Sequence, residues 1–361
     1  MEKEYNWFWF CCVPELTIKD KRKLLEIFGE PENIMNAKKE LLEKTGFLND
    51  KKVQIIRKYQ NRFDAPAMYH KWRDFGIQFI SSVHQEYPDK LKQIYDYPLG
   101  LYYYGRVPGR EERCVAVVGA RMCTGYGREM TEKLSMLLAD NGVCVVSGLA
   151  YGIDAIAQQT CIENGGISYG ILGCGPDICY PKENRQIYEK LKKMGGIISE
   201  YPPGTPVRQW QFPARNRIIS GLCEKLVVVE AKKKSGTLIT ADFALEQGRD
   251  VYAFPGRISD GVSAGCNRLI AQGAGIITDL DEFMKESGLL SETPEKPKKS
   301  NLILATPEKL VYICVDSRLR SLQEIIDATK MTVPEVISAL YGLKKMGLIE
   351  ETEKNYYRRL R

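Results

Sequence analysis

The sequence contains very little histidine and no Cys-x-x-Cys pair, and both facts limit the chemistry it can perform. Only His70 and His84 are present, and both precede Cys114, where the main strand-and-helix region begins. The eleven cysteines include no Cys-x-x-Cys pair, so a zinc site is poorly supplied and no metal or disulfide framework is expected. Most of these thiols fall in apolar segments and act there as small hydrophobes. A reducing cytoplasm is the expected compartment.

Long apolar runs and a strong charge imbalance are also missing. No apolar run approaches the length of about 18 residues that a membrane span needs, and the first residues show no signal-peptide pattern. We therefore expect no membrane association. The net charge of +6 is mildly basic, which permits a polyanionic partner without requiring one.

At 361 residues the chain is long enough for two or three domains. Residues 1–62 are predicted to form a small helical domain, with one helix over 33–44, whose turns resemble SAM or helix-hairpin-helix modules; a helical cap without a ligand is the alternative. Residues 63–288 form the main α/β domain. The polar, proline-bearing segment 289–304 is predicted to be a linker. Capping-box patterns and a terminal hairpin predict a winged helix over 305–361.

Strands and helices alternate from Cys114 to about Lys285, which indicates a doubly wound parallel sheet of the extended Rossmann type. The predicted strands are Val115–Val118, Val143–Val146, Ser168–Leu172, Gly196–Ser199, Leu226–Val229, Asp250–Phe254 and Gly275–Thr278. Two earlier strands, Ile77–Ile80 and Leu101–Tyr104, are expected to extend one edge. In such sheets ligands bind beyond the carboxyl ends of the strands.

Almost every loop at that edge carries glycine together with arginine or lysine. Glycine lets the backbone approach a ligand, helix N-termini add partial positive charge, and arginine grips phosphate with two hydrogen bonds. A row of such loops suits several phosphates in succession, as on a nucleic-acid strand. For any single loop, a tight turn with solvated basic residues is the competing interpretation. Four aromatic residues are expected on this edge: Tyr126, Tyr151, Tyr180 and Phe212. Each is expected either to stack on a nucleic-acid base or to pack in the core.

Two enzyme classes compete with strand binding. A dinucleotide-dependent oxidoreductase would need a G-x-G-x-x-G loop and an acid at the end of the second strand. The segment from Gly119 to Gly127 does not fit the glycine pattern, and Ser147-Gly148 stands where the acid should be. A nucleotide-processing enzyme akin to Rossmann-type phosphoribohydrolases is the stronger alternative. Asp154 and Asp177 are its candidate bases, although each carboxylate also suits a turn or a helix start.

Six motifs occur in an order that resembles the DprA/Smf DNA-processing proteins of bacteria. They are Val118-Gly-Ala-Arg121, Ser147-Gly-Leu-Ala-Tyr-Gly-Ile-Asp154, Tyr180-Pro-Lys-Glu-Asn184, Phe212-Pro-Ala-Arg-Asn-Arg-Ile-Ile-Ser-Gly221, Ser235-Gly-Thr-Leu-Ile-Thr240 and Gly248-Arg-Asp-Val-Tyr-Ala-Phe-Pro-Gly256. Thr124 stands where many members of that family carry serine, which keeps the hydroxyl.

The resemblance implies a non-catalytic protein, without cofactor or metal, that binds single-stranded DNA, protects it and loads the RecA recombinase during natural transformation. It also implies a homodimer through the sheet domain, near Gly265 to Gly273. Arg121 and Lys182 match the arginine and the lysine of the family's DNA pocket. The full set of expected DNA-contacting residues is Gly119, Arg121, Thr124, Gly125, Ser147, Gly148, Lys182, Asn184, Phe212, Arg215, Asn216, Arg217, Ser235, Gly236 and Thr237.

Overall fold

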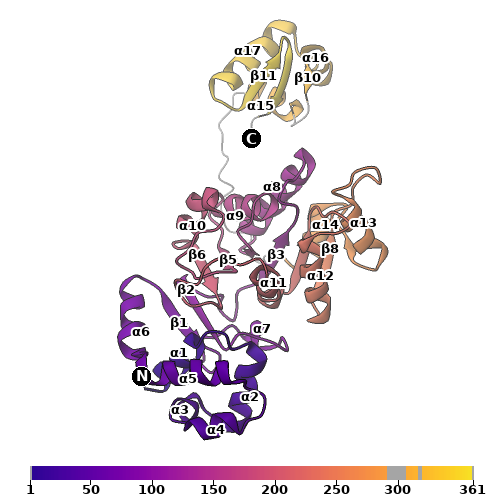
Figure 1. Cartoon of the computed structure of the whole chain (residues 1–361). Helices are drawn as coiled ribbons and strands as arrows, with labels where there is room; N and C mark the ends of the chain where they lie inside the picture. The colour runs from indigo at the N-terminus through magenta and orange to yellow at the C-terminus, as the bar shows by residue number, and fades with distance from the viewer. Residues whose placement is uncertain (1, 291–305, 316–318, 360–361) are drawn as a thin grey trace. The chain divides into compact units, whose positions relative to one another are not determined.

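The structure, a computed structural model, describes residues 2–290, 306–315 and 319–359 (Figure 1). The chain divides into two compact units, Met1–Pro294 and Glu295–Arg361. Most of the predicted linker, 289–304, lies outside the described residues. The larger unit is a mixed α/β fold built on a nine-stranded sheet. No helix in the described ranges has the length and the apolar character needed to cross a membrane.

The sheet has the strand order β1-β2-β6-β5-β4-β3-β7-β8-β9, and the strands from β3 to β9 run parallel. β2 lies antiparallel on β6, and β1 lies antiparallel on β2. The strands are β1 (Gln78–Ser81), β2 (Gly100–Gly105), β3 (Cys114–Val118), β4 (Cys144–Ser147), β5 (Ser168–Leu172), β6 (Gly195–Ser199), β7 (Lys225–Val228), β8 (Asp250–Ala253) and β9 (Gly275–Ile276). These agree with the predicted strands within two residues at either end. The chain leaves β3 toward β4 and later returns to its other side as β7, which makes the end of β3 the switch point of the sheet.

Helices cover both faces of this sheet. Successive residues of β3 point to opposite faces: Val115 and Val117 join one core with Leu134 and Leu138 of α8, and Ala116 joins the other. The helices of this region are α7 (Asp89–Lys92), α8 (Gly125–Asp140), α9 (Ile153–Glu163), η1 (Lys182–Asn184), α10 (Arg185–Leu191), α11 (Gln211–Gly221), α12 (Gly236–Glu246), α13 (Ala264–Ala271) and α14 (Leu280–Glu286). A parallel sheet whose strands are apolar on both sides requires this double cover.

The N-terminal helices share a core with the first two strands. They are α1 (Glu2–Cys12), α2 (Ile18–Phe28), α3 (Pro31–Met35), α4 (Lys39–Glu43), α5 (Asp50–Arg62) and α6 (Ala65–Asp74). The side chains of Phe8, Phe79 and Tyr102 meet in this core. The predicted single helix over 33–44 is wrong, because the chain breaks after Met35. Gln60 of α5 donates hydrogen bonds to the carbonyl of Ile34, before the break, and to that of Ala37, within it, a long-range contact that local periodicity does not reveal.

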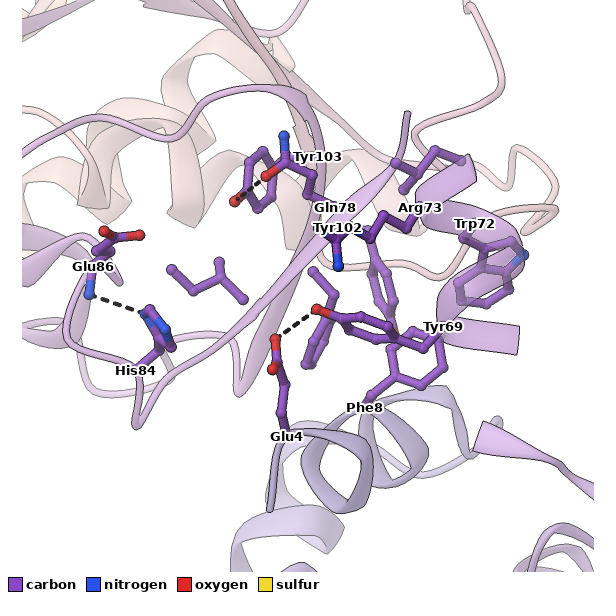
Figure 2. A pocket seen from close by; sticks show the side chains of 13 residues that line it. Glu4, Phe8, Tyr69, Trp72, Arg73, Gln78, His84, Glu86, Tyr102 and Tyr103 are labelled. Atoms are coloured by element: carbon purple, nitrogen blue, oxygen red, sulfur yellow. Dashed lines mark hydrogen bonds between the residues drawn. The ribbon is translucent and has the colours of Figure 1, made fainter. Parts of the chain in front are cut away.

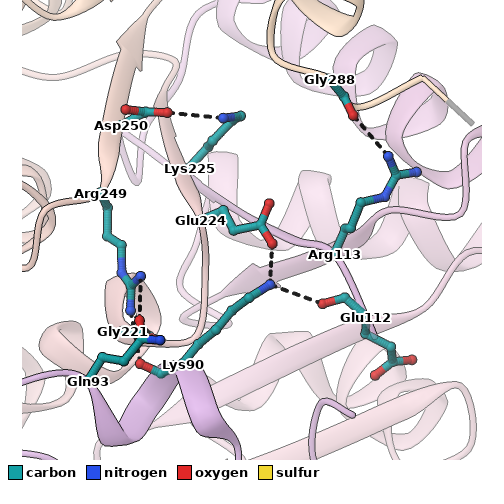
Figure 3. A network of polar contacts seen from close by, with 10 residues as sticks. All are labelled: Lys90, Gln93, Glu112, Arg113, Gly221, Glu224, Lys225, Arg249, Asp250 and Gly288. Carbon is teal, nitrogen blue, oxygen red and sulfur yellow. Dashed lines mark hydrogen bonds and ion pairs between the residues drawn. The ribbon is translucent and has the colours of Figure 1, made fainter. Parts of the chain in front are cut away.

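A polar network fastens the amino edge of the parallel strands (Figure 3). Lys90 of α7 forms an ion pair with Glu224, immediately before β7. The Arg249 guanidinium, just before β8, donates to the Lys90 carbonyl at 2.9 Å and to the Gly221 carbonyl at 3.3 Å. Lys225 pairs with Asp250 at 3.0 Å. These bonds hold neighbouring connections together at the amino edge and leave the carboxyl edge for the glycine-rich loops.

The smaller unit contains α15 (Thr306–Cys314), α16 (Leu322–Thr329) and α17 (Val333–Lys345) with a three-stranded antiparallel sheet of order β10-β12-β11. The strands are β10 (Arg320–Ser321), β11 (Ile349–Glu353) and β12 (Tyr356–Arg359). Both predicted capping boxes are confirmed: Ser321 with Glu324 begins α16, and Thr332 with Glu335 begins α17. Val336, Leu340 and Leu343 of α17 lie in the core of this unit.

Candidate nucleic-acid interface

The loop after β3 is held in place by the start of α9 and by α12. Gly152, at φ +71°, packs so closely that a Cβ there would lie 2.3 Å from the carbonyl oxygen of Ala120. The Ile153 amide donates to the same oxygen at 3.2 Å, and the Thr237 hydroxyl donates to the Gly119 carbonyl at 3.1 Å. These contacts fix the two residues that precede Arg121, whose side chain is exposed. The loop therefore presents a cation from a rigid base.

Arg121 lies beside two aromatic rings that come from other strand ends. Its guanidinium carbon is 5.9 Å from the centroid of the Phe212 ring, at the start of α11. Phe212 in turn lies 5.6 Å from Tyr180, in the segment that follows β5, with an angle of 30° between the rings. Lys182, two residues after Tyr180, is also exposed. Among the described residues, none forms an ion pair with Arg121 or with Lys182. A cation beside partly exposed aromatic rings, as Arg121 is, suits a strand of phosphates and bases.

The N-terminus of α12 adds an open anion-binding end to the same edge. Its cap residue Ser235 makes no capping hydrogen bond, and its hydroxyl oxygen is buried without a partner among the described residues. Gly236 is exposed, and the segment 232–234 contributes three exposed lysines. Asn216 of α11 donates to the Gly236 carbonyl at 3.5 Å. Unfilled N–H groups and the helix dipole favour an anion at such an end.

The N-terminus of α8, by contrast, is already filled by a carboxylate. Glu230 is 1% exposed and accepts hydrogen bonds from the Thr124 amide at 2.9 Å and from the Thr124 hydroxyl. A Cβ on Gly127 would lie 2.4 Å from this carboxylate. Thr124 and the exposed Gly125 thus lie on the edge, but the Thr124 donors are occupied. Glu230 is not among the residues predicted for the site; its signal in the sequence is an acid directly after the apolar run 226–229.

The loop after β4 forms a buried scaffold. The Ser147 hydroxyl donates to the Val117 carbonyl at 2.7 Å, which ties β4 to β3. The Gly148 amide donates to Asp154 Oδ2 at 3.1 Å, and Arg215 Nη1 donates to the Gly148 carbonyl at 2.9 Å. Burial raises the pKa of Asp154, and burial lowers the pKa of Arg215 to about 10. The two charges offset each other within a site that excludes water.

The same loop contains Leu149 in the left-handed region, at φ +54°. A leucine in this region is strained and persists only where its surroundings hold it. Its amide donates to the side chain of the buried Gln158 at 3.1 Å, and its carbonyl accepts from Asn184 Nδ2 at 2.9 Å. Because Asn184 belongs to η1, this bond also fixes the short helix that begins at the exposed Lys182.

The structure places the predicted contact residues in two groups. The group at the surface comprises Gly119, Arg121, Thr124, Gly125, Lys182, Phe212, Asn216, Ser235, Gly236 and Thr237, each exposed or partly exposed. The buried group comprises Ser147, Gly148, Asn184, Arg215 and Arg217.

Arg217 is buried in an ion-pair cluster of its own. It pairs with Glu200 at 2.8 Å and with Asp96 at 3.0 Å. The candidate base Asp177 is likewise engaged, because its carboxylate accepts the Gly204 amide at 2.9 Å. The buried arginines therefore have no direct path to a phosphate. The carboxylates of Asp154 and Asp177 are both engaged in hydrogen bonds.

Comparisons with known proteins show which proteins this chain resembles. DprA from Streptococcus pneumoniae is 44% identical over 200 residues, which are 55% of this chain and 71% of that protein. DprA from Bacillus subtilis is 40% identical over 222 residues, 61% of this chain and 75% of that protein.

Two solved structures resemble the chain in fold. The X-ray structure of DNA processing protein A from Streptococcus pneumoniae superposes with a TM-score of 0.68 at 35% identity, covering 78% of this chain and 97% of the other. A structure of the Helicobacter pylori protein, described for its single-stranded DNA binding mode, has a TM-score of 0.52 at 28% identity and covers 58% and 95% of the two chains. The family model of DNA recombination-mediator protein A matches residues 78–288. The chain belongs to the DNA recombination-mediator protein A family.

Proposed function

We propose that this protein is a DNA-processing protein that binds single-stranded DNA along the carboxyl edge of its sheet, without a catalytic step of its own. The observation that carries the proposal is the convergence of Arg121, Phe212 and Tyr180 from three separate strand ends. A cation that has no carboxylate partner in the part of the chain that the structure describes, placed beside an aromatic ring, offers a phosphate and a base their preferred contacts side by side. The Helicobacter pylori relative, with its single-stranded DNA binding mode, supports the same ligand.

The predicted contact residues divide by role in this proposal. The surface group defined above contacts the single-stranded DNA, with Arg121 and Lys182 on phosphates and Phe212 on a base. The open N-terminus of α12 receives a further phosphate through the amides of Gly236 and Thr237. The buried group positions these contacts: Arg215 and Asp154 hold the loop after β4, and Asn184 holds η1.

A binding titration tests this proposal. A fluorescently labelled oligo-dT is titrated with the full chain, and duplex DNA of equal length is the comparison. We expect tighter binding to oligo-dT, and weaker binding by the separate variants Arg121→Ala and Lys182→Ala. Lys193→Ala is the matched control, because it removes an exposed lysine at the amino end of β6. Wild-type affinity for oligo-dT in both variants would mean that the DNA binds elsewhere on the protein.

We also propose that the bound strand is protected and passed to the RecA recombinase, and that the protein acts as a homodimer through the sheet domain near Gly265 to Gly273. Recombination mediation, the role for which the family is named, supports the transfer to a recombinase. α13 and the exposed Ile276 on the edge strand β9 support the dimer surface. Sedimentation of the wild type and of Ile276→Asp checks the dimer; a concentration-independent monomer in the wild type would exclude it. Strand exchange by RecA, measured with and without the protein, checks the transfer.

The proposed domain organisation is a helical domain over 1–62, a Rossmann-like domain over 63–288, a linker over 289–304 and a winged helix over 305–361. Support for the winged helix comes from α15 to α17 and the antiparallel order β10-β12-β11. The helical SAM-like assignment for 1–62 is supported by the short helices α1 to α5. Limited proteolysis tests both boundaries. Cleavage within 289–304 would release the winged helix, and cleavage near residue 62 would release the helical domain. Cleavage within 289–304 alone would contradict the boundary at residue 62. The eleven thiols support residence in the reducing cytoplasm, where natural transformation would use this activity.

A further inference from the structure

A cavity of about 260 Å³ opens beside β1 (Figure 2). It is bounded by α1, by α6 and by the segment that follows β1. Residues from both faces of the strand line it: Gln78 and Ile80 from one face and Phe79 from the other. A cavity that contacts both faces of a strand lies at the edge of that strand. β1 is the first strand in the sheet order, and among the described strands it pairs with β2 alone.

The hydrogen-bond register shows which backbone groups of β1 face this edge. The Ser82 amide donates to the Leu99 carbonyl at 2.9 Å, and the pairing continues with Ile80 opposite Leu101 and Gln78 opposite Tyr103. In an antiparallel pair the hydrogen-bonded positions alternate. The N–H and C=O groups of Phe79 and the N–H of Ser81 therefore point away from β2.

Phe79 is 7% exposed, and outside the ladder with β2 no described residue forms a hydrogen bond with its backbone N–H or C=O. Buried backbone groups without partners are uncommon, because leaving them unpaired costs free energy comparable to a lost hydrogen bond. An added strand would satisfy these groups at once. Sheet edges accept extended peptides in this way, with the main chain providing affinity and alternate side chains providing specificity.

The charges around the cavity favour a cationic side chain. Glu4 and Glu86 both line it, against the single guanidinium of Arg73. Tyr69 donates to Glu4 Oε1 at 2.6 Å, which leaves the other carboxylate oxygen for a guest. Burial, with the charges of Glu86 and Glu4, raises the pKa of Tyr103, so both carboxylates act on the same tyrosine in the cavity. Aromatic rings form much of the remaining wall, and they attract the alkyl stem and the charged head of lysine or arginine.

We propose that β1 is a docking edge for an extended segment of a partner protein, which adds to the sheet as a strand and inserts a lysine or arginine side chain into the cavity between Glu4 and Glu86. The backbone of Phe79 pairs with the incoming strand, and the two carboxylates select its charge. This edge is separate from the carboxyl edge, so the partner and the DNA strand do not compete for the same residues.

A peptide titration tests the proposal on the full chain. The probe is a labelled peptide of about eight alternating lysine and valine residues, the length of an ordinary strand. One comparison peptide carries glutamate in place of lysine, and another carries N-methyl groups on alternate residues, which block pairing along one edge. We expect binding of the lysine peptide only.

The protein variants test the cavity separately. Glu4→Gln and Glu86→Gln should each weaken binding of the lysine peptide about two- to fivefold, as expected for partly exposed ion pairs. Glu2→Gln, an exposed acid on α1 that does not line the cavity, is the matched control. Affinity for oligo-dT should stay unchanged in all three, which confirms the fold and separates this site from the strand-binding edge.

Three outcomes would overturn the proposal: equal binding of the glutamate peptide, full binding of the N-methylated peptide, or wild-type affinity in both carboxylate variants. Self-association that disappears in Ser81→Pro, a change that removes one of the free edge donors, would assign the edge to a second copy of this chain instead.

Discussion

Replacing Arg215 by methionine should separate support of the site from contact with DNA. The Arg215 side chain donates to the carbonyls of Gly148 and Ile171 and lies beside Asp154. Both charged residues are buried, at 6% exposure each. Methionine keeps most of the volume, and removes the charge and the donors. The carboxylate of Asp154 would then be buried without its cation.

Removing one partner of a buried ion pair destabilises a protein by about 3–5 kcal/mol. The lower end applies here, because Asp154 keeps the hydrogen bond from the Gly148 amide and can take up a proton. We therefore expect the free energy of unfolding at about pH 7 to fall by about 3 kcal/mol. Burial raises the pKa of Asp154 already, and loss of Arg215 raises it further. An acid whose folded pKa is raised stabilises the fold at low pH, and this contribution is lost as the pH rises through that pKa. The deficit of the variant should shrink as the pH falls from neutrality toward about 5.

Urea unfolding followed by tryptophan fluorescence measures this difference. All four tryptophans lie in the larger unit, so the signal reports that unit alone. The double variant with Asp154→Leu should lose less stability than the two single variants together, because it leaves no unpaired buried charge. An unchanged urea midpoint in Arg215→Met, together with weaker binding to oligo-dT, would refute the support role and restore Arg215 as a direct phosphate contact.

Four further predictions concern the edges of the sheet. Glu230→Ala should lower the free energy of unfolding by about 1–3 kcal/mol, because the donors of Thr124 lose their acceptor; the exposed Glu246→Ala is its control in the same urea assay. Gly148→Ala should destabilise by about 1–3 kcal/mol, since the new Cβ would lie 2.5 Å from Arg215 Nη2; an unchanged midpoint would contradict the packing. Arg121→Ala should reduce the slope of log affinity for oligo-dT against log salt by about 0.7, the loss of one phosphate contact. Arg249→Met should lower stability by about 1–2 kcal/mol with DNA affinity intact, because it releases carbonyl bonds only at the amino edge; weaker DNA binding would contradict that separation.

The two helix ends beside β3 illustrate how similar sequences acquire different roles. Both α8 and α12 begin with a hydroxyl residue followed by glycine: Thr124-Gly125 and Ser235-Gly236. The first end is closed by Glu230, while the second carries no side-chain cap and lies next to three lysines. A phosphate would meet a carboxylate at α8 and free amides at α12. This difference makes α12 the better anion site, although the sequence alone favoured the glycine loop that precedes α8.

Local pattern in the sequence was sufficient for most of the fold. Short β-branched runs ended by glycine located the strands, and capping boxes at Ser321 and Thr332 located two helix starts. These signals are local, since each depends on residues within one turn or one strand. The same signals indicated that the glycine-rich loops share one edge, because parallel strands present their carboxyl ends together. The order of the motifs then carried the family resemblance.

Only the tertiary structure decided which of those edge residues face solvent. Arg121 and Arg215 both belong to motifs whose sequence predicts phosphate binding. Arg121 is exposed, whereas Arg215 donates a hydrogen bond to a carbonyl 67 positions away in the chain. Glu230 closes a helix start 106 positions away. Burial, ion pairing and the free edge of β1 depend on contacts between segments distant in the chain. Residue type and spacing leave such contacts open, and the packing of the sheet and its helices determines them.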